Sequence, residues 1–355
     1  MTAIVSASDR LAAGLVRYGG RPTLFAVAVM NAITGLGLAA TIAGAFGADS
    51  GLFRQCALLL AEGQTEFCGF LYSPLTALVA RPLTWVSPTA AMVAMTMIGC
   101  AILVAGVALE TRGQEPVNRV LVGVAAFTFA PVVYELLLGQ TTLLIAAALY
   151  LVARRPDAFR NGVPLGLALA LAPKPLLLPI LVWMMVWRRH ALTAALLTTL
   201  TLTGFGIALL GLDQYREWFL VLTGAGSDAV AGTFVLSTRE IGNFSLWPFN
   251  PATFALACAV GAVTLWAILR DCSRGFVASL FAGLLLAPYS LLYAFSILLL
   301  AVKPALAFAP RTTRALALIA NLVRSSPVAL IAWSVGGLVG VCRSILRGGR
   351  VPESR

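Results

Sequence analysis

Long apolar runs alternate with short polar and basic stretches over most of this chain. About twenty apolar residues are the length that an α-helix needs to cross the hydrocarbon core of a bilayer. The runs predict helical spans over residues 22–46, 89–109, 120–138, 141–153, 161–172, 175–187, 191–211, 251–269, 275–288 and 291–302, with one or two more between 315 and 342. We therefore expect an all-α polytopic membrane protein. It should form a single membrane-embedded domain over residues 1–355, with about 10–12 transmembrane helices.

One pair of runs is separated by a break. Residues 161–172 and 175–187 flank the sequence Pro173-Lys174-Pro175. Because proline interrupts a helix, the two runs are either two short crossings or one broken crossing. Irregular backbone at membrane depth is tolerated only beside protein or a water-filled cavity. Lys174 is therefore a candidate for a polar site inside the protein, although its side chain could instead extend to the membrane interface.

Composition supports a membrane protein and excludes a soluble domain. The chain has 355 residues, of which 60% are hydrophobic and 11% charged, whereas soluble domains carry roughly a quarter charged residues. The net charge of +11 comes from small basic clusters between the apolar runs. This pattern is typical of cytoplasmic connections and unlike the continuous basic surface of a nucleic-acid-binding protein. It places the N-terminus in the cytoplasm.

Two connections on the expected outer side, residues 47–88 and 212–250, are much longer than the others. Long loops are usually either functional or disordered. These contain Trp, Phe, Tyr and Pro, so we expect them to be ordered and the chemistry to face outward. Cys56 and Cys68 in the first loop could form a disulfide in an oxidising compartment. They could also be two small buried apolar residues, which the sequence favours.

Several polar residues are predicted at the outer level of the membrane. Asp49 follows the first span and precedes a helical pattern formed by Leu52, Cys56 and Leu59, with Phe53 and Leu60 beside them. Asp is a preferred helix N-cap residue, and the sequence alone favours that role over a functional one. Glu135 is a further carboxylate at this level. Charged groups at membrane depth usually face a protein interior or an aqueous cavity.

Metal chemistry is not expected, because no cysteine has metal-ligand spacing with the single histidine, His190. A carboxylate, a cation and several hydrogen-bonding groups at one depth could instead bind a charged lipid-linked substrate, since a cation pairs with a phosphate.

The order of the motifs resembles glycosyltransferase family 87, a family of GT-C-class membrane transferases that includes polyprenyl-phosphate-mannose-dependent mannosyltransferases. The resemblance covers about two-thirds of the chain. It rests on Asp49, Phe70-Leu71-Tyr72-Ser73-Pro74-Leu75, Gly139-Gln140-Thr141, Lys174-Pro175, Trp187-Arg188-Arg189, Leu212-Asp213-Gln214-Tyr215-Arg216-Glu217-Trp218, Asn243-Phe244-Ser245-Leu246 and Pro288-Tyr289. The chain departs from the family's pattern at two positions. Ser73 stands where Pro is common, and Ala294 stands where many members carry Asp.

The resemblance implies a GT-C-like helical bundle in the plasma (inner) membrane, with its active site facing the periplasmic or extracellular side. The implied reaction moves a sugar, mannose or another hexose or pentose, from a polyprenyl-phosphate donor to a lipid or glycan acceptor. Asp49 would be the general base, and no metal or other cofactor is implied. The implied substrate-binding residues are Lys174, Arg239 and Arg54 for the leaving phosphate, with Gln140, Tyr72 and Tyr289 contacting sugar or phosphate.

Two other functions remain open on the sequence alone. A transporter or flippase of a lipid-linked sugar would explain the spans and the polar residues without needing a base. An inactive scaffold within a membrane complex would need neither. A requirement for Asp49 in turnover separates the transferase from both.

Overall fold

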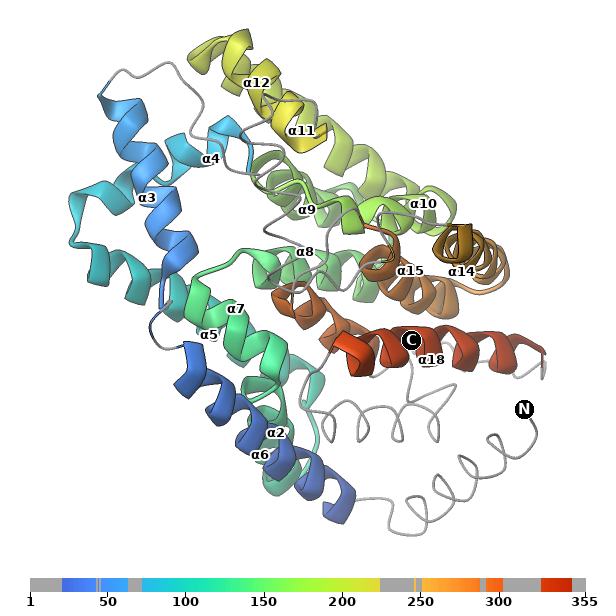
Figure 1. The fold of residues 1–355 in the computed structure, drawn as a ribbon. Coiled ribbons are helices and arrows are strands. Elements are labelled where there is room, and N and C mark those ends of the chain that lie inside the picture. The colour runs from blue at the N-terminus through green and yellow to red at the C-terminus, as the bar shows by residue number, and fades with distance from the viewer. Residues whose placement is uncertain are drawn as a thin grey trace.

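The computed structural model describes residues 21–42, 44, 46–62, 72–223, 246, 251–287, 292–302 and 327–346. Nearly all of these residues are helical, and none of them forms a β-strand (Figure 1). The α-helices and short 3₁₀ helices (η) are α2 (Arg21–Ile42), α3 (Ala48–Ala61), α4 (Pro74–Val79), η2 (Arg81–Trp85), α5 (Pro88–Glu110), α6 (Pro116–Phe127), α7 (Ala130–Leu138), α8 (Thr142–Arg154), α9 (Phe159–Leu171), η3 (Pro175–Leu177), α10 (Leu178–Trp187), α11 (Arg189–Leu210), α12 (Leu212–Thr223), α14 (Pro251–Arg270), α15 (Cys272–Leu286), η4 (Leu292–Leu298) and α18 (Pro327–Leu346). The expected all-α class is confirmed.

Prolines and capping residues explain where several helices begin. Proline lies in the first turn of α4, α5, α6 and α7, where its missing N–H removes no helical hydrogen bond. Ser87 caps α5 by accepting a hydrogen bond from the Ala90 N–H at 3.2 Å. Pro131 also explains why the expected span 120–138 is two helices, because proline cannot continue α6. The axes of α6 and α7 differ in direction by 62°.

The break at Pro173-Lys174-Pro175 is present, as the sequence predicts. Helix α9 ends at Leu171, η3 begins at Pro175, and α10 follows from Leu178. The main neighbours of the two sides differ, since α9 packs along α11 and against α8, whereas α10 packs mainly against α15 and less extensively against α11 and α14. The backbone at Lys174 therefore lies where two helix groups meet.

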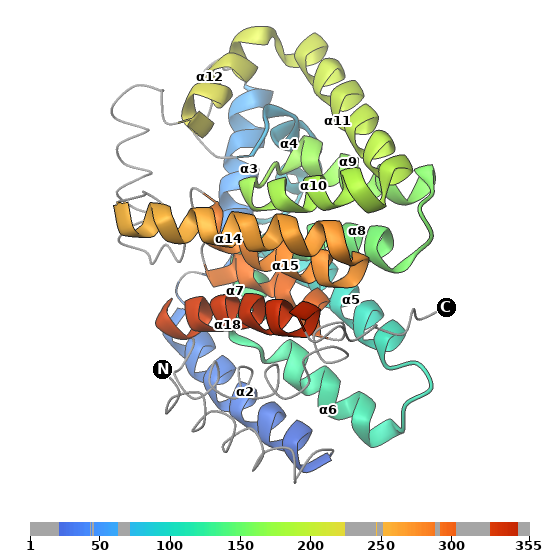
Figure 2. The same ribbon diagram turned by 90° about the vertical axis from the view of Figure 1, so that its right-hand side faces the viewer.

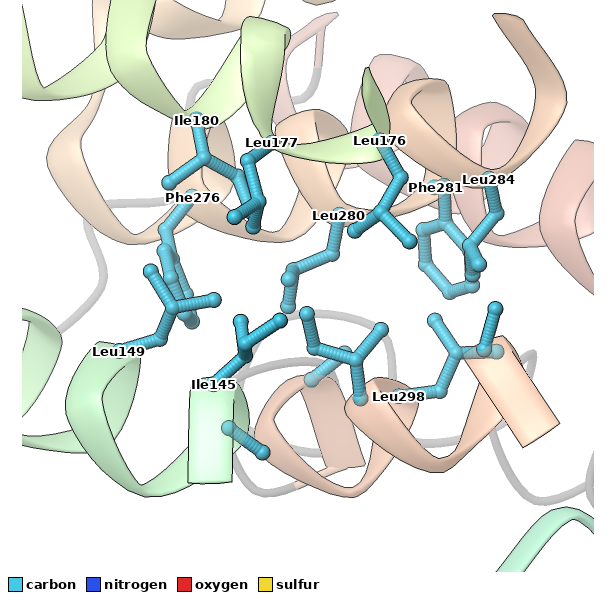
Figure 3. Packing of buried hydrophobic residues seen from close by; sticks show 14 of the residues in the cluster. Ile145, Leu149, Leu176, Leu177, Ile180, Phe276, Leu280, Phe281, Leu284 and Leu298 are labelled. Carbon is cyan, nitrogen blue, oxygen red and sulfur yellow. The ribbon is translucent and has the colours of Figure 1, made fainter. Parts of the chain in front are cut away.

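The core of the protein surrounds α15. Every residue of this helix from Arg274 to Leu285 is buried, as expected of a helix that is apolar all round. It packs against α14, α10, η3, η4 and α18 (Figure 2). Figure 3 shows the packing, with Ile145 and Leu149 of α8 facing Phe276 and Leu280 of α15.

The outside of the molecule is strongly apolar. Of the described helices, α5, α11 and α14 are individually long and apolar enough to cross a membrane, and the bent pair α6–α7 would be a fourth. Helix α5 exposes Met97 and Val104, and α11 exposes Leu200 and Phe205. Exposed apolar surface on such helices suits contact with lipid. The chain is thus a multi-pass membrane protein, and the expected 10–12 crossings stay a prediction.

A second, smaller core holds α3 in place. It consists of Phe53, Cys56 and Ala57 from α3 with Ala77 of α4 and Ala80, the C-cap residue of α4. The expected short helix after the first span is confirmed. Its buried residues include Phe53 and Cys56, which belong to the expected apolar side, and also Ser50 and Ala57, which do not. Leu52 and Leu59 are only partly buried.

Cys56 is 2% exposed and disulfide-bonded. The interpretation of this residue as an unpaired buried group is therefore wrong. Cys68 lies outside the described residues.

Ser73, one of the two departures from the family pattern, joins α4 to the end of α9. Its N–H donates to the Leu171 carbonyl at 3.1 Å, and its hydroxyl donates to the Ala170 carbonyl. Proline at this position would make neither bond, because it lacks both the N–H and a polar side chain. The serine thus fixes α4, and the adjacent Tyr72, against α9.

Candidate functional site

Asp49 lies in the first turn of α3. It is not the N-cap that the sequence favours, since that position is held by Gly47, in a left-handed conformation with φ of 71°. The Asp49 carboxylate is half-buried and accepts a hydrogen bond from Gln140, in the turn between α7 and α8. It is therefore held by a residue far away in sequence, not by the backbone of its own helix.

Two glycines allow α3 to approach the end of α7. The Gly47 N–H donates to the Leu137 carbonyl at 2.6 Å. Gly139 ends α7 with φ of 73°, a conformation that residues with a side chain rarely adopt. A Cβ on Gly139 would lie 3.0 Å from the Cβ of Ser50, which is fully buried. The close approach brings Asp49 beside the α7–α8 turn.

The side chain of Gln140 is fixed at both ends. Its Nε2–H donates to Oδ2 of Asp49, and its Oε1 accepts a hydrogen bond from the Tyr72 hydroxyl. The Tyr72 ring in turn packs edge-on against Phe53, with the ring centroids 4.7 Å apart. This chain of contacts gives the Gln140 amide one orientation and so orients the Asp49 carboxylate.

Lys174 completes the cluster from the break between α9 and η3. Its side chain is only 8% exposed, so the alternative in which it extends to the membrane interface is wrong. The Nζ donates to Oγ1 of Thr142 at 3.1 Å. It also lies 4.7 Å from the ring centroid of Tyr293 and 5.8 Å from that of Tyr72, close enough for a cation–π interaction.

Charges of both signs meet in this cluster. Burial raises the pKa of Asp49 above its ordinary value, although the hydrogen bond from Gln140 and the positive charge of Lys174 both act to lower it. Helix α3, which carries Asp49, is not among the described helices that are long and apolar enough to cross a membrane. The cluster thus combines an oriented carboxylate with a buried cation.

Within the described part of the chain, no three His, Cys, Asp or Glu side chains are placed to hold a metal ion. The chemistry that this cluster can perform is proton transfer at Asp49 and stabilisation of an anion at Lys174.

The structure brings four of the predicted site residues together: Asp49, Gln140, Tyr72 and Lys174. Arg54 is not part of the cluster, because its Nε–H donates to the Leu83 carbonyl at 3.2 Å and so joins α3 to η2. The other two predicted residues, Arg239 and Tyr289, lie outside the described residues.

Three neighbours were not among the predicted site residues. The Tyr134 side chain interacts electrostatically with Asp49, and its ring lies parallel to that of Tyr293, with centroids 6.4 Å apart. Glu135 is 1% exposed and interacts electrostatically with Lys174. A carboxylate in an otherwise apolar run is a signal for Glu135. The two tyrosines carry no comparable signal, because aromatic residues are common in apolar helices.

Comparison with known protein families gives one match. The sequence model of glycosyltransferase family 87 matches residues 70–323, more than half of the chain. The matched region includes Tyr72, Gln140 and Lys174, and it begins after Asp49. Neither the curated proteins nor the solved structures include a significant match. On the extent of the family match, the chain belongs to glycosyltransferase family 87.

Proposed function

We propose that this membrane glycosyltransferase moves a sugar from a polyprenyl-phosphate donor to a hydroxyl of a lipid or glycan acceptor on the outer face of the plasma membrane. Asp49 is the general base in this proposal. The observation that carries it is the orientation of the Asp49 carboxylate by Gln140, beside the buried cation Lys174. A scaffold has no need for such an oriented and costly pair of charges in an apolar protein.

The transfer step follows from the chemistry of a carboxylate base. Asp49 takes the proton of the acceptor hydroxyl while the hydroxyl oxygen forms a bond to the anomeric carbon of the sugar. The bond between that carbon and the donor phosphate oxygen breaks, and its electron pair stays on the phosphate. A single displacement of this kind inverts the anomeric configuration. General base catalysis typically contributes about 10²–10⁴-fold in rate.

The leaving group explains the need for a cation. A polyprenyl phosphate leaves as an anion, so it needs charge stabilisation and no proton. The Lys174 ammonium has three N–H donors, and within the described part of the chain one of them is given to Thr142. The others can reach a phosphate oxygen. Lysine is a common phosphate ligand that acts as a point charge.

The membrane setting supports the proposal of a polyprenyl-phosphate donor. A sugar donor whose leaving group is a lipid phosphate reaches a site among apolar helices from the bilayer, whereas a nucleotide sugar would have to leave the cytoplasm. The buried cation suits a phosphate, and the apolar exterior of α5 and α11 suits a long lipid chain.

The test is transfer in vitro. Purified protein in lipid nanodiscs is incubated with a panel of radiolabelled polyprenyl-phosphate sugars and a membrane-lipid extract. Wild type, Asp49→Asn and Lys174→Met are compared. We expect label to move to a new lipid with wild type only. Lys174→Met should bind polyprenyl phosphate more weakly, while its binding of the uncharged polyprenol stays the same.

The possible results separate the alternatives. Equal transfer by wild type and Asp49→Asn keeps the enzyme but contradicts Asp49 as its base. Donor binding without transfer from any member of the panel contradicts the proposed donor class and favours a carrier of lipid-linked sugars. Equal binding of polyprenyl phosphate by Lys174→Met and wild type contradicts the anion site.

A further inference from the structure

Glu135 is a buried carboxylate to which the transfer mechanism assigns no role. It lies in α7 and is 1% exposed. A carboxylate in such surroundings is costly unless its charge and hydrogen bonds are compensated. Ionisable groups of this kind in membrane proteins usually serve function. The hydrogen bonds of Glu135 to the α7–α8 turn and to the start of α8 indicate its role.

The side chain of Glu135 holds the beginning of α8. Its Oε1 accepts a hydrogen bond from the Leu143 N–H at 2.9 Å. Leu143 belongs to the first turn of α8, whose N–H groups have no partner within their own helix. Thr141, the N-cap residue of α8, makes no capping bond with its side chain. Glu135 therefore supplies from α7 the cap that α8 does not supply for itself.

The backbone of Glu135 holds the other side of the same turn. Its carbonyl accepts hydrogen bonds from the N–H groups of Gly139 and Gln140, each at 3.1 Å. Glu135 thus fixes both sides of the turn. Its backbone carbonyl holds Gly139 and Gln140, and its carboxylate holds Leu143. This turn carries Gln140, which bonds to Asp49, and leads into Thr142, which bonds to Lys174.

We propose that Glu135 is a positioning residue of the transferase site: by holding the α7–α8 turn, it aims Gln140 at Asp49. Its role in catalysis rests on the proposed function of Asp49. Its effect on the Asp49 carboxylate does not, and it can be measured without substrate.

The sign of one measurement distinguishes this role from a direct effect of charge. The hydrogen bond from Gln140 stabilises the Asp49 carboxylate and lowers its pKa. If loss of Glu135 misplaces Gln140, Asp49 will hold its proton to higher pH. If Glu135 acts on Asp49 only through its negative charge, its removal will have the opposite effect, because a nearby negative charge favours the protonated form of an acid.

The other ionisable residues on the elements packed against α3 are not substituted in the experiment, except in one control. The elements packed against α3 carry Arg81 on η2, Cys100 and Glu110 on α5, and Tyr134 beside Glu135 on α7. Lys174 interacts electrostatically with Asp49, as Tyr134 does. None of these residues is altered in the variants compared, apart from a Glu110 control.

The experiment is a pH titration of Asp49 by infrared difference spectroscopy on protein in nanodiscs. The band of the protonated carboxyl is assigned by its loss in Asp49→Asn. Glu135→Leu removes the acceptor and the charge, whereas Glu135→Gln removes the charge but keeps an acceptor for the Leu143 N–H. Gln140→Leu removes the hydrogen bond to Asp49 directly and gives the reference shift.

We expect Glu135→Leu and Gln140→Leu to move the Asp49 titration to higher pH, and the double variant to move it no further than Gln140→Leu alone. Glu135→Gln should not move it to higher pH. Glu135→Leu should also lower kcat by up to about 100-fold, the loss that a misplacement of about 1 Å can cause. Glu135→Gln should restore most of that rate.

Glu110→Leu is the matched control. Glu110 is also a carboxylate near the end of an apolar helix, but it lies about 27 Å along α5 from Met92, which lies against Gly47 at the start of α3. This variant should leave both the Asp49 titration and kcat unchanged. If Glu135→Leu does not fold, Glu135→Met fills a similar space with an unbranched chain and takes its place.

Two results would overturn the inference. One is a shift to lower pH, or no shift, in Glu135→Leu while Gln140→Leu moves the titration up. The other is a shift in the double variant equal to the sum of the single shifts, which would mean that Glu135 does not act through Gln140. Retention of transfer by Asp49→Asn would instead contradict the proposed role of Asp49 as the base and leave the titration result as it stands.

Discussion

Among single residues, Asp49 is the one through which the proposed mechanism makes transfer depend on pH. A general base works only when deprotonated, and burial raises the pKa of Asp49 above its ordinary value. We therefore expect kcat/KM to fall as the pH is lowered, with the acid limb at a higher pH than an ordinary aspartate would give. The pH profile of transfer by the wild type measures this limb.

The Tyr72→Phe variant tests the same limb through Gln140. It removes the hydroxyl that holds the Gln140 oxygen and should move the acid limb to higher pH, in the direction of Gln140→Leu. An acid limb that stays in place in both variants would contradict control of Asp49 by Gln140.

Much of the site follows from the sequence because its residues stand in motifs. Asp49, Tyr72, Gln140 and Lys174 were predicted from the order of short patterns, and the structure places them together. Glu135 was recognised only as a carboxylate near the outer level. Its role depends on a hydrogen bond to the next helix, and no pattern along the chain specifies which backbone group a buried carboxylate will meet.

Where helices meet, the packing of α3 against α7 depends on Gly139. Alanine at this position must adopt φ of about 73°, at a cost of roughly 1–2 kcal/mol, and its Cβ would press against Ser50. We expect Gly139→Ala to lower thermal stability and to reduce kcat, because the Gln140 amide moves relative to Asp49. Thermal melting and transfer assays on the same preparation measure both effects.

Gly106→Ala in α5 is the control for this change. A Cβ at Gly106 meets no atom within 4 Å, and replacing a helical glycine by alanine is stabilising by about 0.5–1 kcal/mol. It should leave kcat unchanged. Equal activity and stability of the two variants would contradict a special requirement for glycine at the end of α7.

Helix positions were predictable where apolar runs end at prolines or charges. The expected span 89–109 is α5, and 251–269 is α14. The bend at Pro131 was not predicted, and the buried side of α3 was predicted only at Phe53 and Cys56. The bend falls at Thr128 and Pro131, inside a run that is otherwise mostly apolar. In α3, the partners Ala77 and Ala80 decide which side is buried, and they are distant in sequence.

For the whole molecule, orientation in the membrane is the main prediction. The basic clusters place the loop after α5 in the cytoplasm and α12 outside. Gln114 in that loop and Arg216 in α12 are exposed, so we choose the variants Gln114→Cys and Arg216→Cys. Each is introduced into a chain in which the free cysteines Cys100, Cys258, Cys272 and Cys342 are replaced by alanine. A membrane-impermeant maleimide should label only Arg216→Cys in intact cells, and both variants after lysis.

The reverse labelling pattern would place the Asp49 cluster on the cytoplasmic side, where a nucleotide-sugar donor is accessible. It would contradict the outward-facing reaction while leaving Asp49 as a base. The single-domain organisation and the number of crossings also remain predictions. Length and composition support three crossings by single described helices and a fourth by the bent pair α6–α7, and several described apolar helices are shorter.

The most direct test of the central claim is a single-turnover transfer assay with the active donor of the panel at saturating concentration. Wild type, Asp49→Asn and the control Glu110→Gln are compared, so that differences in donor affinity do not enter the rate. The account predicts that Asp49→Asn binds the donor but transfers at least about 10²-fold more slowly, while Glu110→Gln matches the wild type. A wild-type single-turnover rate in Asp49→Asn would contradict it.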